Sequence, residues 1–540
     1  MAAIIHQTDK RSGITYAYTS ESYWDKEKKQ SRAKRTLIGR VDKETGEIVS
    51  TDGRNRRITM DDSSADRVKK RGPVPAQELS RRFYGATYLF DAIGEKLGIT
   101  ADLKRCFGDS HKQILSIAYY LMLEEQGALF RFEKWGILHQ HPYGKNIASQ
   151  RSSDLFASIT EAQKQQFFTL QGKRKADKEF WAYDTTSISS YSETLSQVQY
   201  GHNKEHDPLA QLNLAIVFGA DSNLPFYYRK LAGNIPDSKT VYHLLGDLDR
   251  LGFAKVKLVM DRGFYSEANM NALYHEHRKF LLSVNMSLAF VQKKLEPLYE
   301  HFRTFEHYDS DYELYMHSVA TTWNYTHERP YKGDSVQEER RLYIHYYFNI
   351  ERAAEEEKRL DRRLMQLREE LLTDKPLKAN EALYARYFTL TKTPKRGVNV
   401  QVKEDAVAKT KRYFGFFALI TNEKMGAKEA LQIYRNKDVV EKAFGNLKER
   451  LNLRRLLVSS EQSLDGKLFV AFIALIYLSY IKKKMQQSTL FKTYTIGTML
   501  DKLDVIECFE TPKQKLRVGE ILNKQIEIYA ALEIEPPASL

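Results

Sequence analysis

Alternation of apolar and polar residues near the N-terminus predicts a small β module. Ile14, Tyr16 and Tyr18 alternate with polar neighbours, and the turn-forming segment 43–46, Lys-Glu-Thr-Gly, separates two further apolar positions, Ile38 and Ile48. We expect this basic β module to span residues 1–75. The run Lys-Lys-Arg-Gly-Pro at 69–73 then predicts an exposed linker.

A helical period follows the linker. From Glu78 to Gly172 apolar residues recur at spacings of three and four, as in Tyr88, Leu89 and Ala92. We therefore predict a helical module at residues 76–175. It is either a packing module or a reader of DNA ends, since its spacing does not identify a helix-turn-helix.

The period changes again near residue 176, where segments rich in aromatic and β-branched residues predict strands. The order is three strands followed by helix, strand, helix and strand, which implies a mixed sheet flanked by helices. The predicted elements are strands at 180–190, 212–218 and 226–231, a helix at 237–251 capped by Asp237 or Ser238, a strand at 255–260, a helix capped by Ser266 and a strand at 280–284.

A long segment separates this region from a second stretch with an α/β pattern. It contains a strand-like segment at 342–348 and a charge-laced helix at 351–372, most simply a solvated hairpin with ion pairs at spacing four. A strand at 414–421 and a long helix at 428–453 follow. We expect a core in two parts, 176–285 and 412–485, interrupted by an insertion domain at 286–411 and followed by a C-terminal helical region at 486–540.

One apolar run, Leu468 to Ile481, ends in three lysines. Its 14 residues are fewer than the ~20 that a membrane span requires, so a buried core helix is the better interpretation. We expect no membrane association. The N-terminal apolar stretch is also too short for an export signal, and we expect a cytoplasmic protein.

Composition and charge narrow the functional classes. The 540 residues contain 84 Lys and Arg against 70 Asp and Glu, a net charge of +14, with ordinary apolar and charged fractions that exclude disorder. Two cysteines exclude a disulfide framework and a cysteine zinc cluster, so any metal would have oxygen or imidazole ligands. The positive charge suits a polyanionic partner, and the basic linker is either a tether or a DNA-backbone contact.

Two aspartates occupy positions that suggest chemistry. Asp184 lies in the middle of a predicted strand, where a lone buried charge is costly, so either a bound cation neutralises it or it lies on an edge strand capped by neighbouring hydroxyls. Asp261 follows a buried strand, at the carboxyl edge where open α/β sheets place ligands. Together they are better evidence for a site than either residue alone.

A third group of residues lies on the predicted helix 428–453. At about 100° per residue, Tyr434, Lys437, Glu441 and Lys448 fall on one stripe, next to an apolar stripe that includes Phe444 and Leu447. The helix is either an ordinary amphipathic helix with a Lys437–Glu441 surface pair or a carrier of a metal ligand and phosphate contacts.

The set as a whole resembles the DDE transposases of bacterial insertion sequences, whose signature has the form Y-x2-R-x3-E-x6-K. Tyr434, Glu441 and Lys448 match it, while Lys437 stands at the Arg position and keeps the charge without the planar fork. Asp184 and Asp261 match the first two acidic positions. Further similarity runs through Gly-His-Asn-Lys at 201–204 and through the segment 231–237.

The resemblance implies an α/β fold with an RNase H-like core interrupted before its last acidic residue, and two-metal phosphoryl transfer that cleaves and joins DNA. It makes Asp184, Asp261 and Glu441 the catalytic ligands of two Mg²⁺ ions, with Mn²⁺ as a substitute. Asp438 and Glu449 are rival carboxylates on the same helix, and their offsets from the common stripe make them second choices. Tyr434, Lys437 and Lys448 would contact DNA. The implied partners are double-stranded DNA, as inverted-repeat ends and target, and a second copy of the chain.

Three other functions stay open at this point. The chain could be a DNA-binding protein that keeps the fold but no longer cuts, or an RNase H-like nuclease that cleaves without strand transfer. A metal-dependent phosphatase with strand-end aspartates is the third. The basic charge and the long N-terminal modules argue against the phosphatase.

Overall fold

The computed structural model divides the chain into two compact units, Met1–Ala76 and Gln77–Leu540. It describes residues 3–51, 80–124, 128–174, 179–204, 207–253, 255–328, 335–373, 375–393, 397–437, 444–451, 455–456, 460–510 and 516–538. The predicted linker at 69–73 lies outside these residues.

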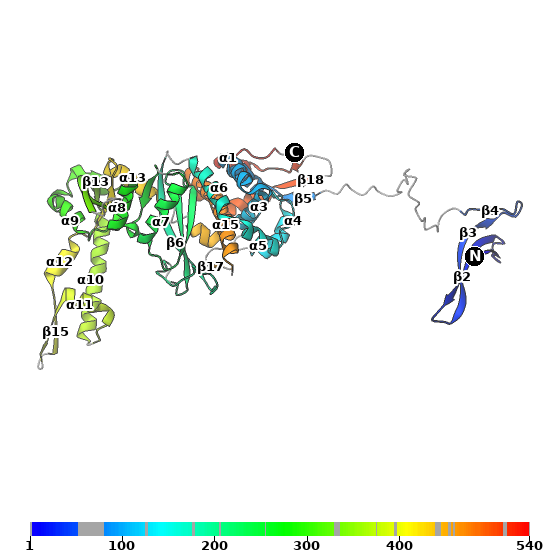
Figure 1. Cartoon of the computed structure of the whole chain (residues 1–540), viewed down its shortest axis with the longest axis horizontal. Coiled ribbons are helices and arrows are strands. Elements are labelled where there is room, and N and C mark those ends of the chain that lie inside the picture. Colours follow the sequence, from blue (N-terminus) through cyan, green and yellow to red (C-terminus); the bar gives the residue numbers. More distant parts are fainter. Residues whose placement is uncertain are drawn as a thin grey trace. The chain divides into compact units, whose positions relative to one another are not determined.

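The first unit contains a four-stranded antiparallel sheet (Figure 1). Its strands are β1 Ala3–Thr8, β2 Thr15–Asp25, β3 Gln30–Val41 and β4 Ile48–Val49. The predicted turn joins β3 to β4, and Gly46 there adopts a positive φ of 71°, which glycine accommodates without strain. The alternating pattern therefore located the β2–β3–β4 strands.

Helices dominate the start of the second unit, as the three- and four-residue spacing predicted. They are α1 Gly85–Leu97, α2 Ile99–Phe107, α3 His111–Leu123, α4 Phe132–Leu138, α5 Ser149–Ser158 and α6 Glu161–Lys173. A short strand that the pattern did not predict, β5 Ser80–Phe83, precedes them and pairs with β18 Glu507–Glu510 near the C-terminus.

A long mixed sheet forms the centre of the unit. From one edge its strands run in the order β11, β12, β13, β16, β10, β9, β6, β7, β8, with β17 also paired to β6. Only the β10–β9, β9–β6 and β17–β6 pairs are parallel. The strands are β6 Phe180–Ser190, β7 Gln211–Gly219, β8 Pro225–Ala232, β9 Lys257–Met260, β10 Lys279–Val284, β11 Tyr308–Asp309, β12 Leu314–Glu328, β13 Ser335–Phe348, β16 Phe416–Thr421 and β17 Arg455–Leu456.

Side chains alternate between the two faces of this sheet, as strand geometry requires. Leu258 and Met260 of β9 pack into the large core, while Val259 packs on the opposite face. On that opposite face lies α13 Ala427–Asn436, through Ala430 and Leu431. The helices α7 Asp237–Arg250, α8 Glu267–His275 and α9 Ala289–Leu295 complete this part of the chain.

The predicted insertion region contributes to two different structures. Its strands β11, β12 and β13 extend the central sheet through the β13–β16 pair. The rest forms a small unit with its own apolar core, which includes Leu367, Leu371 and Tyr387. Helix α10 is therefore more than a solvated hairpin, because its leucines are buried. The elements are α10 Ile350–Leu372, α11 Glu381–Tyr387, β14 Phe388–Thr393, β15 Gly397–Val402 and α12 Glu404–Lys411.

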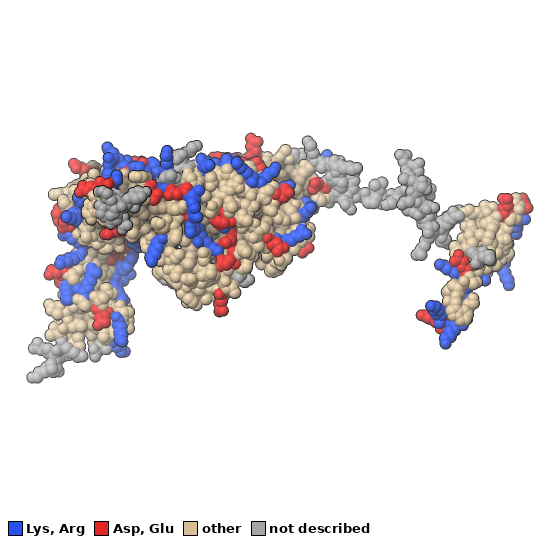
Figure 2. All heavy atoms as spheres, in the orientation of Figure 1, with Lys and Arg blue, Asp and Glu red and all other residues tan. Residues whose placement is uncertain are grey.

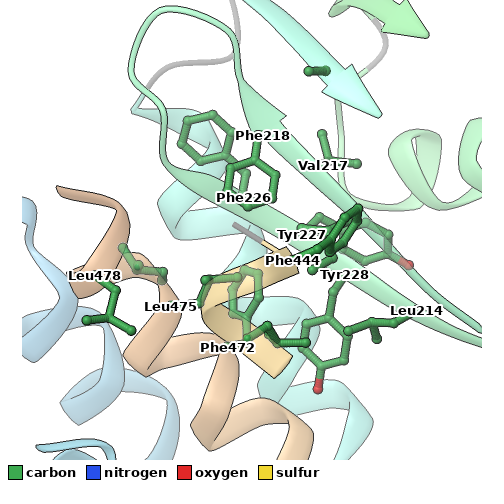
Figure 3. Packing of buried hydrophobic residues seen from close by; sticks show 14 of the residues in the cluster. Leu214, Val217, Phe218, Phe226, Tyr227, Tyr228, Phe444, Phe472, Leu475 and Leu478 are labelled. Atoms are coloured by element: carbon green, nitrogen blue, oxygen red, sulfur yellow. The ribbon is translucent and has the colours of Figure 1, made fainter. Parts of the chain in front are cut away.

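The predicted apolar run lies inside helix α15, Glu461–Gln487. Among the described residues it is the one helix long and apolar enough to cross a membrane, and 89% of its apolar window is buried within the protein. Phe472 packs against Tyr228 of β8, with ring centroids 5.0 Å apart (Figure 3). The C-terminal region adds α16 Ile496–Asp504, α17 Asn523–Ala531 and the strands β18 and β19 Arg517–Val518. It is therefore not purely helical.

Gly466 allows α15 to approach α5 closely. A Cβ at this position would lie 2.2 Å from the carbonyl oxygen of Phe156. We expect Gly466→Ala to lower the free energy of unfolding by about 2–3 kcal/mol, because the clash is with backbone that cannot rotate away. Thermal unfolding of the full chain measures this.

A matched control is Gly246→Ala within α7, where a Cβ would meet nothing within 4 Å. That variant is expected to be neutral or stabilised by up to about 1 kcal/mol, because alanine has the better helix propensity. Equal melting temperatures for the two variants would contradict the close approach of α15 and α5.

Candidate active site

The two predicted aspartates lie on neighbouring parallel strands. Tyr183 of β6 pairs with Met260 of β9, so Asp184 and Asp261 are the next residues in register. β9 pairs with β6 only up to Tyr183, and β17 pairs with it from Ser189 onward. Within the described residues no strand covers this edge of β6 between those points, which leaves room for side chains from elsewhere. β6 pairs with β7 along its other side and with β9 just before Asp184, so it is not an edge strand, and the edge-strand alternative for Asp184 is wrong.

Each aspartate is held by the backbone that follows it. The Thr185 N–H donates to Oδ1 of Asp184 at 2.8 Å, and the Arg262 N–H donates to Oδ1 of Asp261, also at 2.8 Å. These bonds fix the Asp184 carboxylate within β6 and the Asp261 carboxylate just after the end of β9. Each keeps a second oxygen for another partner.

Lys437 lies between the two carboxylates. Its Nζ is 3.9 Å from Oδ2 of Asp184 and 3.8 Å from Oδ2 of Asp261, and the residue is only 2% exposed. It stands directly after α13, which ends at Asn436. Tyr434, one turn earlier, donates its phenol proton to Oδ1 of Asp261 at 2.8 Å. The structure thus brings together four of the six predicted site residues.

The electrostatic surroundings of the two carboxylates differ. Burial raises the pKa of Asp184 despite the opposing effect of Lys437 and Lys204. Burial also acts to raise the pKa of Asp261, but Lys437, the Tyr434 phenol and the Arg262 N–H outweigh it, so the net pKa is lowered. Asp261 is accordingly the more stable anion of the two.

The other two predicted residues are placed differently. Lys448 is buried in a π-helical turn, Asn446–Arg450, where the sequence predicted a continuous α-helix from 428 to 453. Glu441 lies outside the described residues, as does its rival Asp438. The second rival, Glu449, is exposed in the π-helical turn. Phe444, Leu447 and Leu451 are buried, which confirms that part of the apolar stripe.

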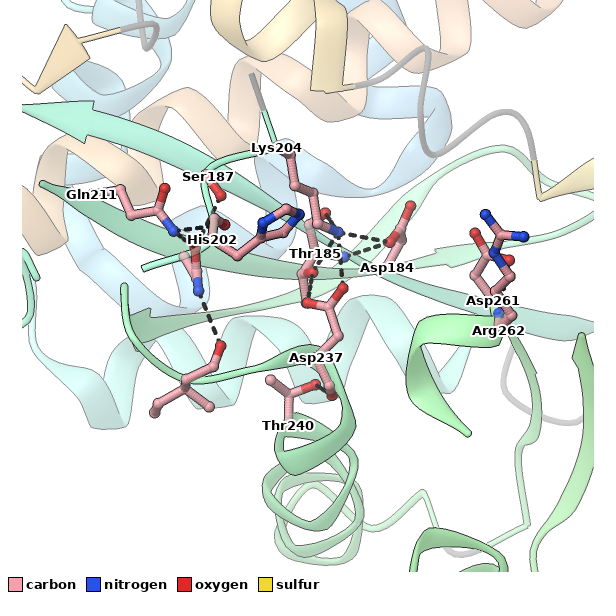
Figure 4. Close-up of polar contacts among 12 residues, drawn as sticks. Asp184, Thr185, Ser187, His202, Lys204, Gln211, Asp237, Thr240, Asp261 and Arg262 are labelled. Atoms are coloured by element: carbon pink, nitrogen blue, oxygen red, sulfur yellow. Dashed lines mark hydrogen bonds and ion pairs between the residues drawn. The ribbon is translucent and has the colours of Figure 1, made fainter. Parts of the chain in front are cut away.

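Three residues of the site were not predicted as functional. Lys204 donates to the carbonyl oxygen of Thr185 at 2.7 Å, and its Nζ lies 3.6 Å from Asp184 and 3.1 Å from Asp237 (Figure 4). Thr185 donates its hydroxyl to Asp237. Asp237 is therefore not the predicted helix cap, since α7 begins after Pro236 without a side-chain cap. Lys204 and Asp237 lie in the similar segments 201–204 and 231–237, and Thr185 lies next to Asp184 in the Tyr-Asp-Thr-Thr motif, but nothing in the sequence assigned these three residues to the site.

A buried polar network positions the loop that carries Lys204. Gln211 donates from Nε2 to the carbonyl oxygens of His202 and Gly233, both at 3.0 Å, and Asn203 donates to Ser189 at 3.2 Å. A Cβ on Gly233 would lie 2.0 Å from the Gln211 carbonyl oxygen, so only glycine allows this approach. The loop is held rigidly beside Asp184.

The donor set fits a hard metal ion. The two aspartates supply oxygen ligands, and they already converge on one buried cationic group, the Lys437 ammonium. Within the described residues no three His, Cys, Asp or Glu side chains form a metal-binding group. A third ligand from the signature, Glu441, falls outside them.

Comparison with known proteins agrees with this geometry. The family model described as "Transposase DDE domain" matches residues 175–477, more than half of the 540 residues. The chain belongs to this family. The match spans β6, β9 and α13, the elements that carry the site, and the mixed α/β sheet fits the RNase H-like fold of DDE transposases. Members of this family generally use divalent metal ions.

A solved structure is also similar, although distantly. It is the cryo-EM structure of a piggyBac transposase synaptic complex with hairpin DNA. The similarity covers 77% of this chain and 70% of that chain, at 8% sequence identity and a TM-score of 0.31, too low to support an argument about this chain. No curated protein matches the sequence.

Proposed function

We propose that the protein is the transposase of an insertion sequence, which binds the terminal inverted repeats of its element, cleaves the DNA there and joins the ends to target DNA. The observation that supports this most is the side-by-side placement of Asp184 and Asp261 around the buried Lys437 ammonium. We also propose that two copies act on paired ends in the bacterial cytoplasm.

In this proposal the core is RNase H-like and is interrupted between β10 and β16. Asp184, Asp261 and Glu441 would hold two Mg²⁺ ions, for which Mn²⁺ could substitute. Bound divalent ions supply Lewis-acid stabilisation of the charge on the attacking and leaving oxygens of the phosphodiester.

The chain's own residues would orient the metal-binding carboxylates and bind the DNA. The Tyr434 phenol and the Arg262 N–H fix the Asp261 carboxylate, while Lys204 and the Thr185 N–H fix Asp184. Lys437 and Lys448 would contact DNA phosphates and Tyr434 the terminal nucleotide.

A cleavage assay tests the proposal. Purified full-length protein is incubated with Mg²⁺ and a DNA fragment that carries the ends flanking its gene, with a supercoiled plasmid as target. We expect cuts at those ends and joined products, and neither in the presence of EDTA nor on a fragment with scrambled ends.

Two results would replace the proposal with an alternative. Metal-dependent cuts without joined products, under conditions that pair two ends, would indicate a nuclease without strand transfer. Tight, end-specific binding without cuts would indicate a DNA-binding protein that has lost catalysis.

A further inference from the structure

A large basic groove opens beside Asp261 and Tyr434. Its volume is about 860 Å³, and it lies between helix α10 on one side and β16, α13 and the segment 283–287 on the other. We call it the basic groove. Among the described residues, seven cationic side chains line it, against the two carboxylates of Asp261 and Glu356: Arg262, Arg352, Arg359, Arg363, Arg386, Lys409 and Arg435.

Helix α10 presents one stripe of side chains to the basic groove. Arg352, Glu356, Arg359 and Arg363 follow one another at spacings of four, three and four, which places them on one helix face. The adjacent stripe, which includes Leu367, is buried in the small core formed with β14, β15 and α11. Packing of the leucines thus directs the arginines into the groove.

The single acidic residue on this stripe, Glu356, is paired with other residues that form the side of the groove. Glu356 lies 3.0 Å from Nε of Arg352 and accepts a hydrogen bond from the Gly415 N–H at 2.8 Å. Arg359 and Lys409, in contrast, are exposed. In the space-filling view, Lys and Arg side chains gather on the part of the chain that carries α10 (Figure 2). The groove therefore has a net positive charge that its own carboxylates do not cancel.

Aromatic side chains lie between these cations. Tyr413, Phe414 and Phe417 line the groove and are half-buried, and the Arg352 guanidinium lies over the Phe417 ring, 5.5 Å from its centroid. Cations with interleaved aromatic rings are typical of surfaces that bind single-stranded nucleic acid, where bases stack and phosphates pair. The volume is within the range of pockets for small organic molecules, so it suits a few nucleotides and not a duplex.

We infer that the basic groove binds a single DNA strand that extends from the site at Asp184 and Asp261. Phosphates contact the α10 arginines and Lys409, and bases stack on Tyr413 and Phe414. The Phe417 ring is already stacked on Tyr347 and covered by the Arg352 guanidinium. The inference rests on the proposed function for its identification of DNA as the ligand, and it assigns the strand-binding role to residues outside the carboxylate site.

Binding measurements in EDTA separate this inference from the catalytic proposal. The full-length protein is titrated into two fluorescent DNA probes whose sequence is unrelated to the ends of the element. One is a blunt duplex and the other is the same duplex with a six-nucleotide single-stranded tail. Fluorescence anisotropy is recorded. We expect about tenfold tighter binding to the tailed duplex, as base stacking would provide. No cleavage is needed, so an inactive protein would still give a result.

The variant Arg359→Ala/Lys409→Ala removes two exposed cations of the groove. We expect it to lose most of the preference for the tail and to lower the slope of log K against log salt on the tailed probe by about 1.4, at roughly 0.7 per phosphate contact on a single strand. The control Arg362→Ala/Arg368→Ala removes two exposed cations of α10 that do not line the groove. It should keep both the preference and the slope.

Three results would overturn the inference. In the first, the tail adds no affinity to the wild-type protein. In the second, the groove variant weakens binding to the blunt duplex as much as to the tailed duplex, which would assign the groove to double-stranded DNA. An equal loss of tail preference in the control would also overturn it, because general charge would then explain the effect.

Discussion

Replacing Asp184 by Asn is expected to lower the rate of DNA cleavage by at least about 10³-fold, while DNA-end binding stays within about twofold. The substitution keeps the shape of the side chain and removes the charge that a divalent ion requires. Metal stabilisation of the reacting oxygens is worth several kcal/mol, and each 1.4 kcal/mol is a factor of ten in rate. Single-turnover cleavage and electrophoretic mobility shifts measure the two quantities.

The wild-type protein and Asp184→Asn also allow metal binding to be measured independently of DNA cleavage. Mg²⁺ should raise the melting temperature of the wild-type protein, because a ligand that binds only the folded state stabilises it, and should do so much less in Asp184→Asn. Asp109→Asn, at an exposed position away from the site, is the control and should behave like wild type in both assays. Cleavage retained by Asp184→Asn would remove this residue from the ligand set.

Replacing Lys437 by Met is expected to destabilise the metal-free protein by about 3 kcal/mol. The ammonium is buried and lies within 4 Å of two carboxylates, and removing one partner of a buried ion pair leaves uncompensated charge. Mg²⁺ should then stabilise the variant more than it stabilises the wild-type protein, because an added cation takes over the charge balance that the ammonium provides. Thermal unfolding with EDTA and with saturating Mg²⁺ measures both effects.

Lys437→Arg is the matched variant, because it keeps the charge and restores the residue type of the family signature. We expect a smaller loss of stability than in Lys437→Met and a gain with Mg²⁺ close to that of wild type. If Mg²⁺ raised the melting temperature of Lys437→Met no more than that of wild type, the ammonium and the metal ion would not share the two carboxylates.

The sequence predicted the strands of the central sheet well because their signal is local. Period-two and apolar runs bounded by turn residues located β6 to β10 within a few residues. The parallel pairing of β6 and β9 then places Asp184 of β6 beside Asp261, which follows β9. The pairing of β13 with β16 was not predictable in this way, since strand partners far apart in sequence carry no periodic signal.

The site was predictable in part for the same reason. Asp184, Asp261 and Tyr434 were recognisable from local sequence. The roles of Lys204 and Asp237 depend on where packing directs their side chains, and Asp237 looked like a helix cap. The end of α13 at Asn436 also went unpredicted, because the helical period of the sequence continues past it while the structure places Lys437 outside the helix.

The continuous central sheet sets the distance between helix α10 and the carboxylate site. Helix α10 follows directly on β13. Three strand-to-strand steps, through β16 and β10, separate β13 from β9, and Asp261 is the residue after β9. At about 4.8 Å per step, the sheet sets a lateral spacing of roughly 14 Å between β13 and β9. The fold itself would therefore set the distance between the scissile phosphate and a DNA strand bound to the α10 arginines, and so the length of strand between the two.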